Sequence, residues 1–185
     1  SFSSVIDAVA DPRLRVYLYH IPPVAQVGIS LALIDRLLAA YPGVIAGIKD
    51  SSGDWNNTKA VIEAFAARGF AVYAGSETLL LSTLRAGGAG CISATANVNG
   101  GAIAASAATW REPGADERQA ALDRVRAAFQ QRPMIAAMKA AIAAGTGDEG
   151  WCRVRPPLVE LDAEARRAPA ADLDAIGYAR PTLDA

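Results

Sequence analysis

The residue of this sequence with the clearest chemical potential is a lysine at the end of an apolar segment. Lys49 directly follows the apolar residues 44–48, and a charge at the end of a buried strand is costly unless it is paired or neutral. Burial favours the neutral amine, which is a nucleophile that can attack a carbonyl carbon. The other two lysines, Lys59 and Lys139, lie in segments with helical patterns. Lys49 is therefore the first candidate for covalent chemistry, although a lysine at a strand end can also be a salt-bridged surface residue.

Polar residues also follow two other strand-like segments. Tyr19 ends the first of them, and Gly75 and Glu77 follow the third. In parallel α/β folds the carboxyl ends of all strands lie on one side, so Tyr19, Lys49 and Glu77 are expected to share a cleft. A tyrosine hydroxyl beside an amine can move protons to and from a carbinolamine, as imine chemistry requires. The hydroxyl of Ser51 can hold a carboxylate or hydroxyl group of a substrate.

Each of these residues also has a purely structural interpretation. Tyr19 can be a core or surface residue, and Glu77 can be a first-turn acid favoured by the helix dipole. His20 is the only histidine, but it follows Tyr19 immediately and therefore points to the opposite face of an extended strand. Asp50 and Asp54 could share a metal ion, yet no histidine or further carboxylate stands at ligand spacing, so no metal is expected.

The segments that carry these residues alternate between strand and helix patterns, which predicts repeated βα units and a parallel sheet covered by helices. Strands are predicted at 15–19, 44–49, 71–74 and 90–93, and helices at 31–38 with Ser30 as N-cap, 57–68 and 77–86. After residue 97 the pattern is helical throughout. Helices are predicted at 102–110, 116–131, 133–144, 162–167 and 170–176.

The composition narrows the class of protein. The chain has 185 residues and a formal charge of −1, and without Lys/Arg clusters it is not expected to bind nucleic acid. No apolar run approaches the roughly 20 residues of a membrane span, and no secretory signal is visible. Cys91 and Cys152 are too few for a disulfide framework and are interpreted as reduced thiols of a cytoplasmic protein.

Four motifs, in this order, resemble one family: the pyruvate-dependent class I aldolases of the dihydrodipicolinate synthase and N-acetylneuraminate lyase group. They are residues 19–22 (Tyr-His-Ile-Pro), 47–54 around Lys49, 87–98, and 154–158 (Val-Arg-Pro-Pro-Leu). The resemblance implies an α/β fold, a (β/α)8 TIM barrel followed by an all-helical extension, and an assembly as a homotetramer, a dimer of dimers. The family's first four strands have no counterpart, so 1–98 would be the C-terminal half of the barrel. Residues 99–185 would be the last barrel helix and the extension.

The resemblance also implies a reaction. Lys49 would form a Schiff base with pyruvate or a 2-keto-3-deoxy acid, and Tyr19 would relay the proton, with no external cofactor. Substrate positioning would fall to Ser51, Gly75, Glu77 and the backbone carbonyl of Ile92. The part of the family that grips the pyruvoyl carboxylate lies in the missing half. These residues alone are therefore not expected to form a competent enzyme.

Departures from the family pattern bear on the substrate. His20 replaces the usual asparagine, and Val24 stands where the synthases carry a carboxylate-binding arginine. Ser51 and Glu77 look more like the sugar-acid side of the family, whereas Ala94 replaces a serine of the sialate lyases. A 2-keto acid other than sialic acid is therefore expected. The alternatives are a sugar-acid dehydratase or hydratase-aldolase that uses the same imine, and a non-catalytic binding protein on the same scaffold.

Overall fold

A computed structural model describes residues 2–166, 173 and 175–178 of the chain. The chain divides into two units, Ser1–Ile92 and Ser93–Ala185. The first unit contains every strand of the described residues, and the second is helical. The boundary that the sequence suggests, after residue 98, falls inside the first helix of the second unit. No helix among the described residues has the length and apolar character needed to cross a membrane.

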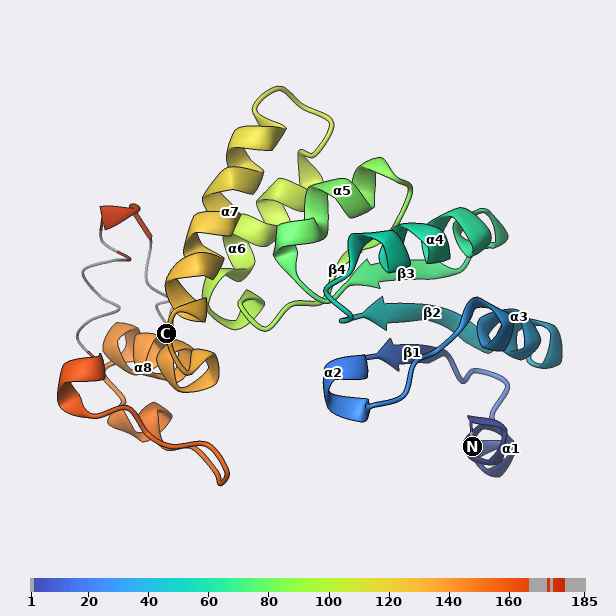
Figure 1. Cartoon of the computed structure of the whole chain (residues 1–185), viewed down its shortest axis with the longest axis horizontal. Coiled ribbons are helices and arrows are strands. Elements are labelled where there is room, and N and C mark those ends of the chain that lie inside the picture. Colours follow the sequence, from blue (N-terminus) through green and yellow to red (C-terminus); the bar gives the residue numbers. More distant parts are fainter. Residues whose placement is uncertain (1, 167–172, 174, 179–185) are drawn as a thin grey trace. The chain divides into compact units, whose positions relative to one another are not determined.

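The first unit is built on a parallel sheet with the strand order β1-β2-β3-β4 (Figure 1). The strands are β1 (Val16–His20), β2 (Ile45–Asp50), β3 (Ala71–Ala74) and β4 (Gly90–Cys91). The helices that connect them are α3 (Leu31–Ala40), α4 (Trp55–Phe65) and α5 (Leu80–Arg85), with 3-10 turns η1 (Ala66–Arg68) and η2 (Glu77–Leu79). The predicted succession of βα units and parallel strands is confirmed. The fourth strand is two residues shorter at its C-terminal end than the sequence suggests.

Among the described residues, those on only one face of the sheet form a hydrophobic core. Leu18, Ile48 and Val72 point to this face and are almost fully buried, together with Ile34 of α3 and Val61 of α4. Successive side chains of a strand point to opposite faces. The neighbours of Leu18 in β1, Tyr17 and Tyr19, are each 50% exposed. The second face of the sheet is therefore open in the described part of the chain, and it carries the tyrosines.

An irregularity sets the register between the first two strands. Val16 pairs with Ile45, but the next residue, Tyr17, pairs with Gly47, so that Ala46 is an extra residue in β2. One strand then carries two residues opposite one on its neighbour, as in a β-bulge. From this point the pairing is regular, and it ends with Tyr19 opposite Lys49 and His20 opposite Asp50.

Capping residues define where the helices begin and end. Ser30 Oγ accepts a hydrogen bond from the Leu33 N–H at 3.2 Å, which confirms the predicted N-cap of α3. Asp54 caps α4 by accepting from the Asn56 N–H at 2.9 Å, so that this helix begins two residues earlier than predicted. Gly69 has a φ of 79°, the left-handed conformation that ends the 3-10 turn η1 after α4.

Two short helices were not predicted from the sequence. They are α1 (Phe2–Val9), which buries only Ile6, and α2 (Pro22–Ala25), which directly follows β1. Proline is favoured in the first turn of a helix because its missing N–H would be unpaired there. The Pro22-Pro23 pair was therefore a usable signal for α2.

The second unit packs three helices around an aromatic pair. The helices are α6 (Ala96–Ala108), α7 (Ala115–Gln130) and α8 (Met134–Thr146), followed by the 3-10 turn η3 (Glu149–Cys152). Phe129 meets Tyr178 edge-on at 6.0 Å, and the Tyr178 hydroxyl donates to the Val98 carbonyl at 2.8 Å. The predicted helix 162–167 is helical at residues 163–166, and most of the predicted helix 170–176 lies outside the described residues.

Candidate active site

Lys49 and Tyr19 lie side by side at the carboxyl ends of β2 and β1. The register makes them partners, and the Lys49 Nζ donates a hydrogen bond to the Tyr19 hydroxyl oxygen at 3.1 Å. The same nitrogen is 4.4 Å from the centre of the Tyr19 ring. The two side chains that the sequence analysis assigns to one cleft are thus in direct contact.

The electrostatics of the pair favour proton transfer. The hydrogen bond from Lys49 is the main reason why the pKa of Tyr19 lies below its usual value. Partial burial opposes this shift, while a hydrogen bond from Ser51 and the charge of Lys49 add to it. A phenol whose pKa approaches the working pH is a better general acid and base. The half-exposed ring also leaves the pair open to a small molecule on the uncovered face of the sheet.

Ser51 is held between the ends of three strands. Its N–H donates to the His20 carbonyl at 2.7 Å, and the Gly75 N–H donates to the Asp50 carbonyl at 2.6 Å. A Cβ at position 75 would lie 2.8 Å from the Ser51 Cα, closer than real side chains approach a backbone. Gly75 is therefore a glycine because Ser51 passes directly against it, a reason that the sequence alone does not reveal.

Glu77 and Ile92 follow the carboxyl ends of β3 and β4. Because the strands are parallel, these ends lie at the same edge of the sheet as the end of β2. Glu77 is fully buried in the first turn of η2, whereas Ile92 is 44% exposed. The Ile92 N–H donates to the Ala74 carbonyl at 2.9 Å and so extends the pairing of β4 with β3. Burial raises the pKa of the Cys91 thiol to about 11, and the nearby charge of Glu77 adds to this shift. Glu77 thus lies close to the end of β4.

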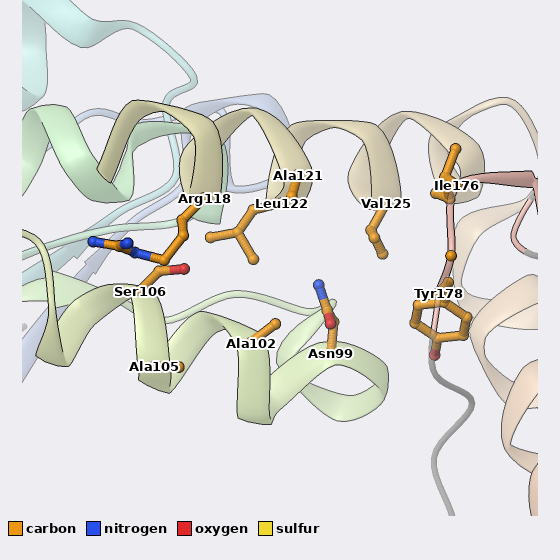
Figure 2. Close-up of a pocket in the computed structure, with 11 residues that line it drawn as sticks. Asn99, Ala102, Ala105, Ser106, Arg118, Ala121, Leu122, Val125, Ile176 and Tyr178 are labelled. Atoms are coloured by element: carbon orange, nitrogen blue, oxygen red, sulfur yellow. The ribbon is translucent and has the colours of Figure 1, made fainter. Parts of the chain in front are cut away.

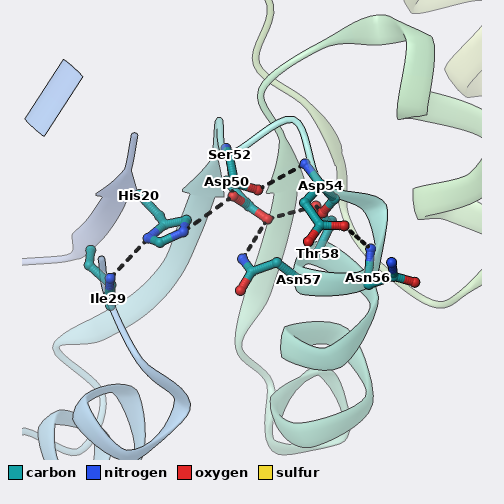
Figure 3. A network of polar contacts seen from close by, with 8 residues as sticks. All are labelled: His20, Ile29, Asp50, Ser52, Asp54, Asn56, Asn57 and Thr58. Atoms are coloured by element: carbon teal, nitrogen blue, oxygen red, sulfur yellow. Dashed lines mark hydrogen bonds and ion pairs between the residues drawn. The ribbon is translucent and has the colours of Figure 1, made fainter. Parts of the chain in front are cut away.

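A second polar cluster is built around His20 and Asp50 (Figure 3). Their side chains point to the covered face of the sheet, because successive residues of a strand point to opposite faces. His20 and Asp50 are 6% and 2% exposed, which confirms that His20 points away from the face of Tyr19. Burial raises the pKa of Asp50, but hydrogen bonds from Thr58, Asn57 and Ser52 outweigh it, and the net shift is downward. Among the residues that the structure describes, no group of three or more histidine, cysteine or acidic side chains could hold a metal ion.

A separate cavity of about 340 Å³ lies within the helical unit (Figure 2). It is lined mainly by α6 and α7, and its polar residues include Asn99, Ser106 and Arg118. The Arg118 guanidinium already donates to the Thr109 carbonyl at 2.7 Å and to the Pro113 carbonyl at 3.1 Å. None of the residues predicted for chemistry lines this cavity. The cavity is therefore not part of the candidate active site.

Comparison with known proteins identifies the family. The model of the dihydrodipicolinate synthetase family matches residues 2–176. An uncharacterised DapA-like lyase of Halobacterium salinarum is 35% identical over 165 residues, which are 88% of this chain and 52% of that protein. The crystal structure of dihydrodipicolinate synthase from Agrobacterium tumefaciens matches with a TM-score of 0.81 and 32% identity, over 95% of this chain and 58% of that one.

A second related structure contains a bound small molecule. YagE, a prophage protein of the same family from Escherichia coli K12, was solved in complex with pyruvate. It matches with a TM-score of 0.82 and 26% identity, over 96% of this chain and 60% of that one. The chain thus spans between 52% and 60% of the length of each of these three proteins.

Proposed function

The chain belongs to the dihydrodipicolinate synthetase family, and we propose that it forms the imine-bearing part of a lyase that acts on pyruvate or a 2-keto-3-deoxy acid. The observation that carries this proposal is the 3.1 Å contact between the Lys49 Nζ and the Tyr19 hydroxyl. An amine and a proton-transferring phenol in contact, at the open ends of parallel strands, are the two groups that imine chemistry requires. The pyruvate bound to the related protein YagE agrees with this substrate class.

In the proposed mechanism the neutral amine of Lys49 attacks the ketone carbon of the substrate. Tyr19 relays one proton from the nitrogen to the resulting oxygen and then donates its own phenol proton as this oxygen leaves as water. This leaves a protonated imine between Lys49 and the substrate, with Tyr19 as the phenolate. The protonated imine withdraws electrons from the adjacent carbon, so that a carbon–carbon bond can break or form there. Hydrolysis by the reverse route then regenerates the amine. The lysine itself supplies the electron sink, so the proposal needs no external cofactor.

Three of the remaining predicted site residues would hold the substrate. We propose that the Ser51 hydroxyl binds a polar group of the substrate, that Gly75 allows Ser51 its close approach, and that the Ile92 carbonyl orients the reacting end. Glu77 is not proposed as a substrate ligand, because its side chain is fully buried. Val24 lies on α2 and is 74% exposed. It offers no guanidinium for the second carboxylate that the synthases bind, so aspartate-semialdehyde condensation is not the proposed reaction. A panel of 2-keto-3-deoxy acids and aldonic acids, with pyruvate release followed, distinguishes cleavage from dehydration.

We further propose that β1–β4 are strands five to eight of an eight-stranded barrel in a longer protein. Two features support this interpretation: one face of the sheet is open, with Tyr17 and Tyr19 half exposed, and the chain spans little more than half of its solved relatives. The other strands would cover this face and complete the pocket around Lys49. We propose a homo-oligomer, a dimer of dimers, for the whole protein.

Reductive trapping tests the function directly. The full-length protein is incubated with pyruvate, reduced with borohydride, digested and analysed by mass spectrometry. We expect a pyruvate-derived adduct on Lys49 and none on Lys59 or Lys139, and we expect the Lys49→Arg variant to give no adduct. A folded wild-type protein without an adduct on Lys49 would exclude the proposed imine mechanism.

A further inference from the structure

The polar cluster behind the active-site pair is formed by the residues that directly follow that pair. Tyr19 is followed by His20, and Lys49 is followed by Asp50. The register places Tyr19 opposite Lys49 and His20 opposite Asp50. Because successive side chains of a strand alternate between faces, the first pair points to the open face and the second to the covered face. Any shift of the second pair therefore moves the backbone that presents the first.

Asp50 ties the end of β2 to the start of α4. Its Oδ1 accepts from the Ser52 N–H at 2.9 Å, and its Oδ2 accepts from Asn57 Nδ2 at 2.9 Å and from the Thr58 hydroxyl at 2.7 Å. These three donors span the loop that contains Ser51 and the first turn of α4. A buried carboxylate with three hydrogen bonds is held in one orientation. The loop around Ser51 is therefore fixed from behind.

His20 ties the end of β1 to the segment that follows α2. Its Nδ1 accepts from the Ile29 N–H at 2.9 Å, so the proton of the neutral ring lies on Nε2. This nitrogen faces Asp50 Oδ1 at 3.9 Å (Figure 3). The segment anchored in this way connects α2 to Ser30, the N-cap of α3. The polar cluster thus consists of His20, Ile29, Asp50, Ser52, Asn57 and Thr58.

The main-chain bonds of the same residues reach the site. The His20 carbonyl accepts from the Ser51 N–H at 2.7 Å, and the Asp50 carbonyl accepts from the Gly75 N–H at 2.6 Å. We propose that His20 and Asp50 are positioning residues, which hold Tyr19, Lys49 and Ser51 in the geometry of the imine reaction without touching the substrate. This inference rests on the proposed function, which it extends to residues that have no contact with the reacting atoms.

Substitutions in the full-length protein can separate positioning from chemistry. The rate of imine formation on Lys49 is measured with saturating pyruvate by borohydride quenching at increasing times. Both carboxylate oxygens of Asp50 accept hydrogen bonds, so the NH2 group of an asparagine would face an N–H or O–H group that it cannot bond. We expect the rate of imine formation in Asp50→Asn to be about tenfold to a hundredfold lower. The control is Asp35→Asn, the same chemical change at an exposed carboxylate that is paired with Arg68 at 2.6 Å. We expect no change in its rate.

The position of the acceptor at residue 20 provides a second test. Asparagine places its Oδ1 where the ring has Nδ1 and can still accept from the Ile29 N–H, whereas glutamine places its carboxamide near Nε2 and cannot. We expect His20→Asn to keep most of the wild-type rate and His20→Gln to lose about tenfold. Hydrogen exchange of residues 26–30 should accelerate in His20→Gln but not in His20→Asn.

The outcomes are distinguishable. If the wild-type protein gives no adduct on Lys49, the proposed function fails, and this inference fails with it. If the wild-type protein gives the adduct and Asp50→Asn and His20→Gln form it at the wild-type rate, the positioning role alone is overturned. Equal losses in His20→Asn and His20→Gln would also overturn it, because they would show that the acceptor for the Ile29 N–H is irrelevant.

Discussion

Tyr17 and Tyr19 allow a matched test of the proton relay at the residue scale. Both belong to β1, point to the open face and are 50% exposed. Only the hydroxyl of Tyr19 contacts Lys49, whereas the ring of Tyr17 packs against that of Tyr73 at 6.1 Å. We expect Tyr19→Phe to lower turnover about a hundredfold to ten-thousandfold, the range of general acid–base catalysis. Tyr17→Phe should stay within a few-fold of wild type, and equal losses in steady-state kinetics would contradict the assignment.

The Cys91 thiol reports on the environment at the end of β4. Burial and the nearby charge of Glu77 raise its pKa to about 11. Because the thiolate is the reactive form, alkylation of native Cys91 should be slow at pH 8 and should accelerate only as the pH approaches this value. Glu77→Gln removes the charge and should shift the pH profile of alkylation downward. An unchanged profile in that variant would show that Glu77 does not act on Cys91.

Asp50 links residue chemistry to the stability of an element, since its carboxylate joins β2 to α4. Its pKa in the folded protein lies below the usual 3.8. The stabilisation that Asp50 provides is therefore complete above that value and is lost as the pH falls through the lower, folded-state pKa. Urea unfolding between about pH 6 and pH 2 should show a weaker loss of stability on acidification in Asp50→Asn than in wild type. An identical acid dependence would contradict this role.

Two glycines with different backbone conformations allow a test of the helical segments that contain or end at them. Gly101 lies inside α6 without an unusual φ, and a Cβ there would meet nothing within 4 Å. Gly101→Ala should therefore stabilise the protein by about 0.5–1 kcal/mol. Gly69 has a φ of 79°, and Gly69→Ala should destabilise it by about 1–2 kcal/mol. Denaturant midpoints of the two variants measure both effects, and shifts of the same sign would contradict the backbone assignment.

Sequence patterns predicted the strands and the longer helices well, because these elements depend on local periodicity and caps such as Ser30. They did not predict α1, because eight residues are too few for periodicity alone to distinguish a helix from a short apolar strand. The hydrogen-bond donors around Asp50 were also missed, because Asn57 and Thr58 look like ordinary first-turn residues. The close approach of Ser51 to Gly75 depends on the pairing of two strands and is not encoded in either segment alone. The chemistry of Lys49 and Tyr19 was accessible from residue type and order, but their contact required the fold.

At the scale of the whole molecule, the open face of the sheet has a measurable consequence. In the described part of the chain, the four-stranded sheet has half-exposed tyrosines on one face and no partner strand at the outer edges of β1 and β4. Such a sheet offers surface that other sheets can pair with. When produced alone, the 185-residue chain should associate and bind a hydrophobic dye more strongly than the full-length protein. Sedimentation at several concentrations measures the association. A dye-silent monomer at all of them would show that the open face needs no cover.

The extra residue in β2 matters to anyone who wishes to transplant these strands. Counted from their first paired residues, Val16 and Ile45, an even alignment would bring Tyr19 beside Ile48, and Lys49 would fall beside His20. The actual contact exists because Ala46 shifts the pairing by one position. A graft into another barrel must therefore carry this residue or align the strands from their carboxyl ends. The two strands keep the contact between Tyr19 and Lys49 after transfer only if their pairing is aligned from the carboxyl ends.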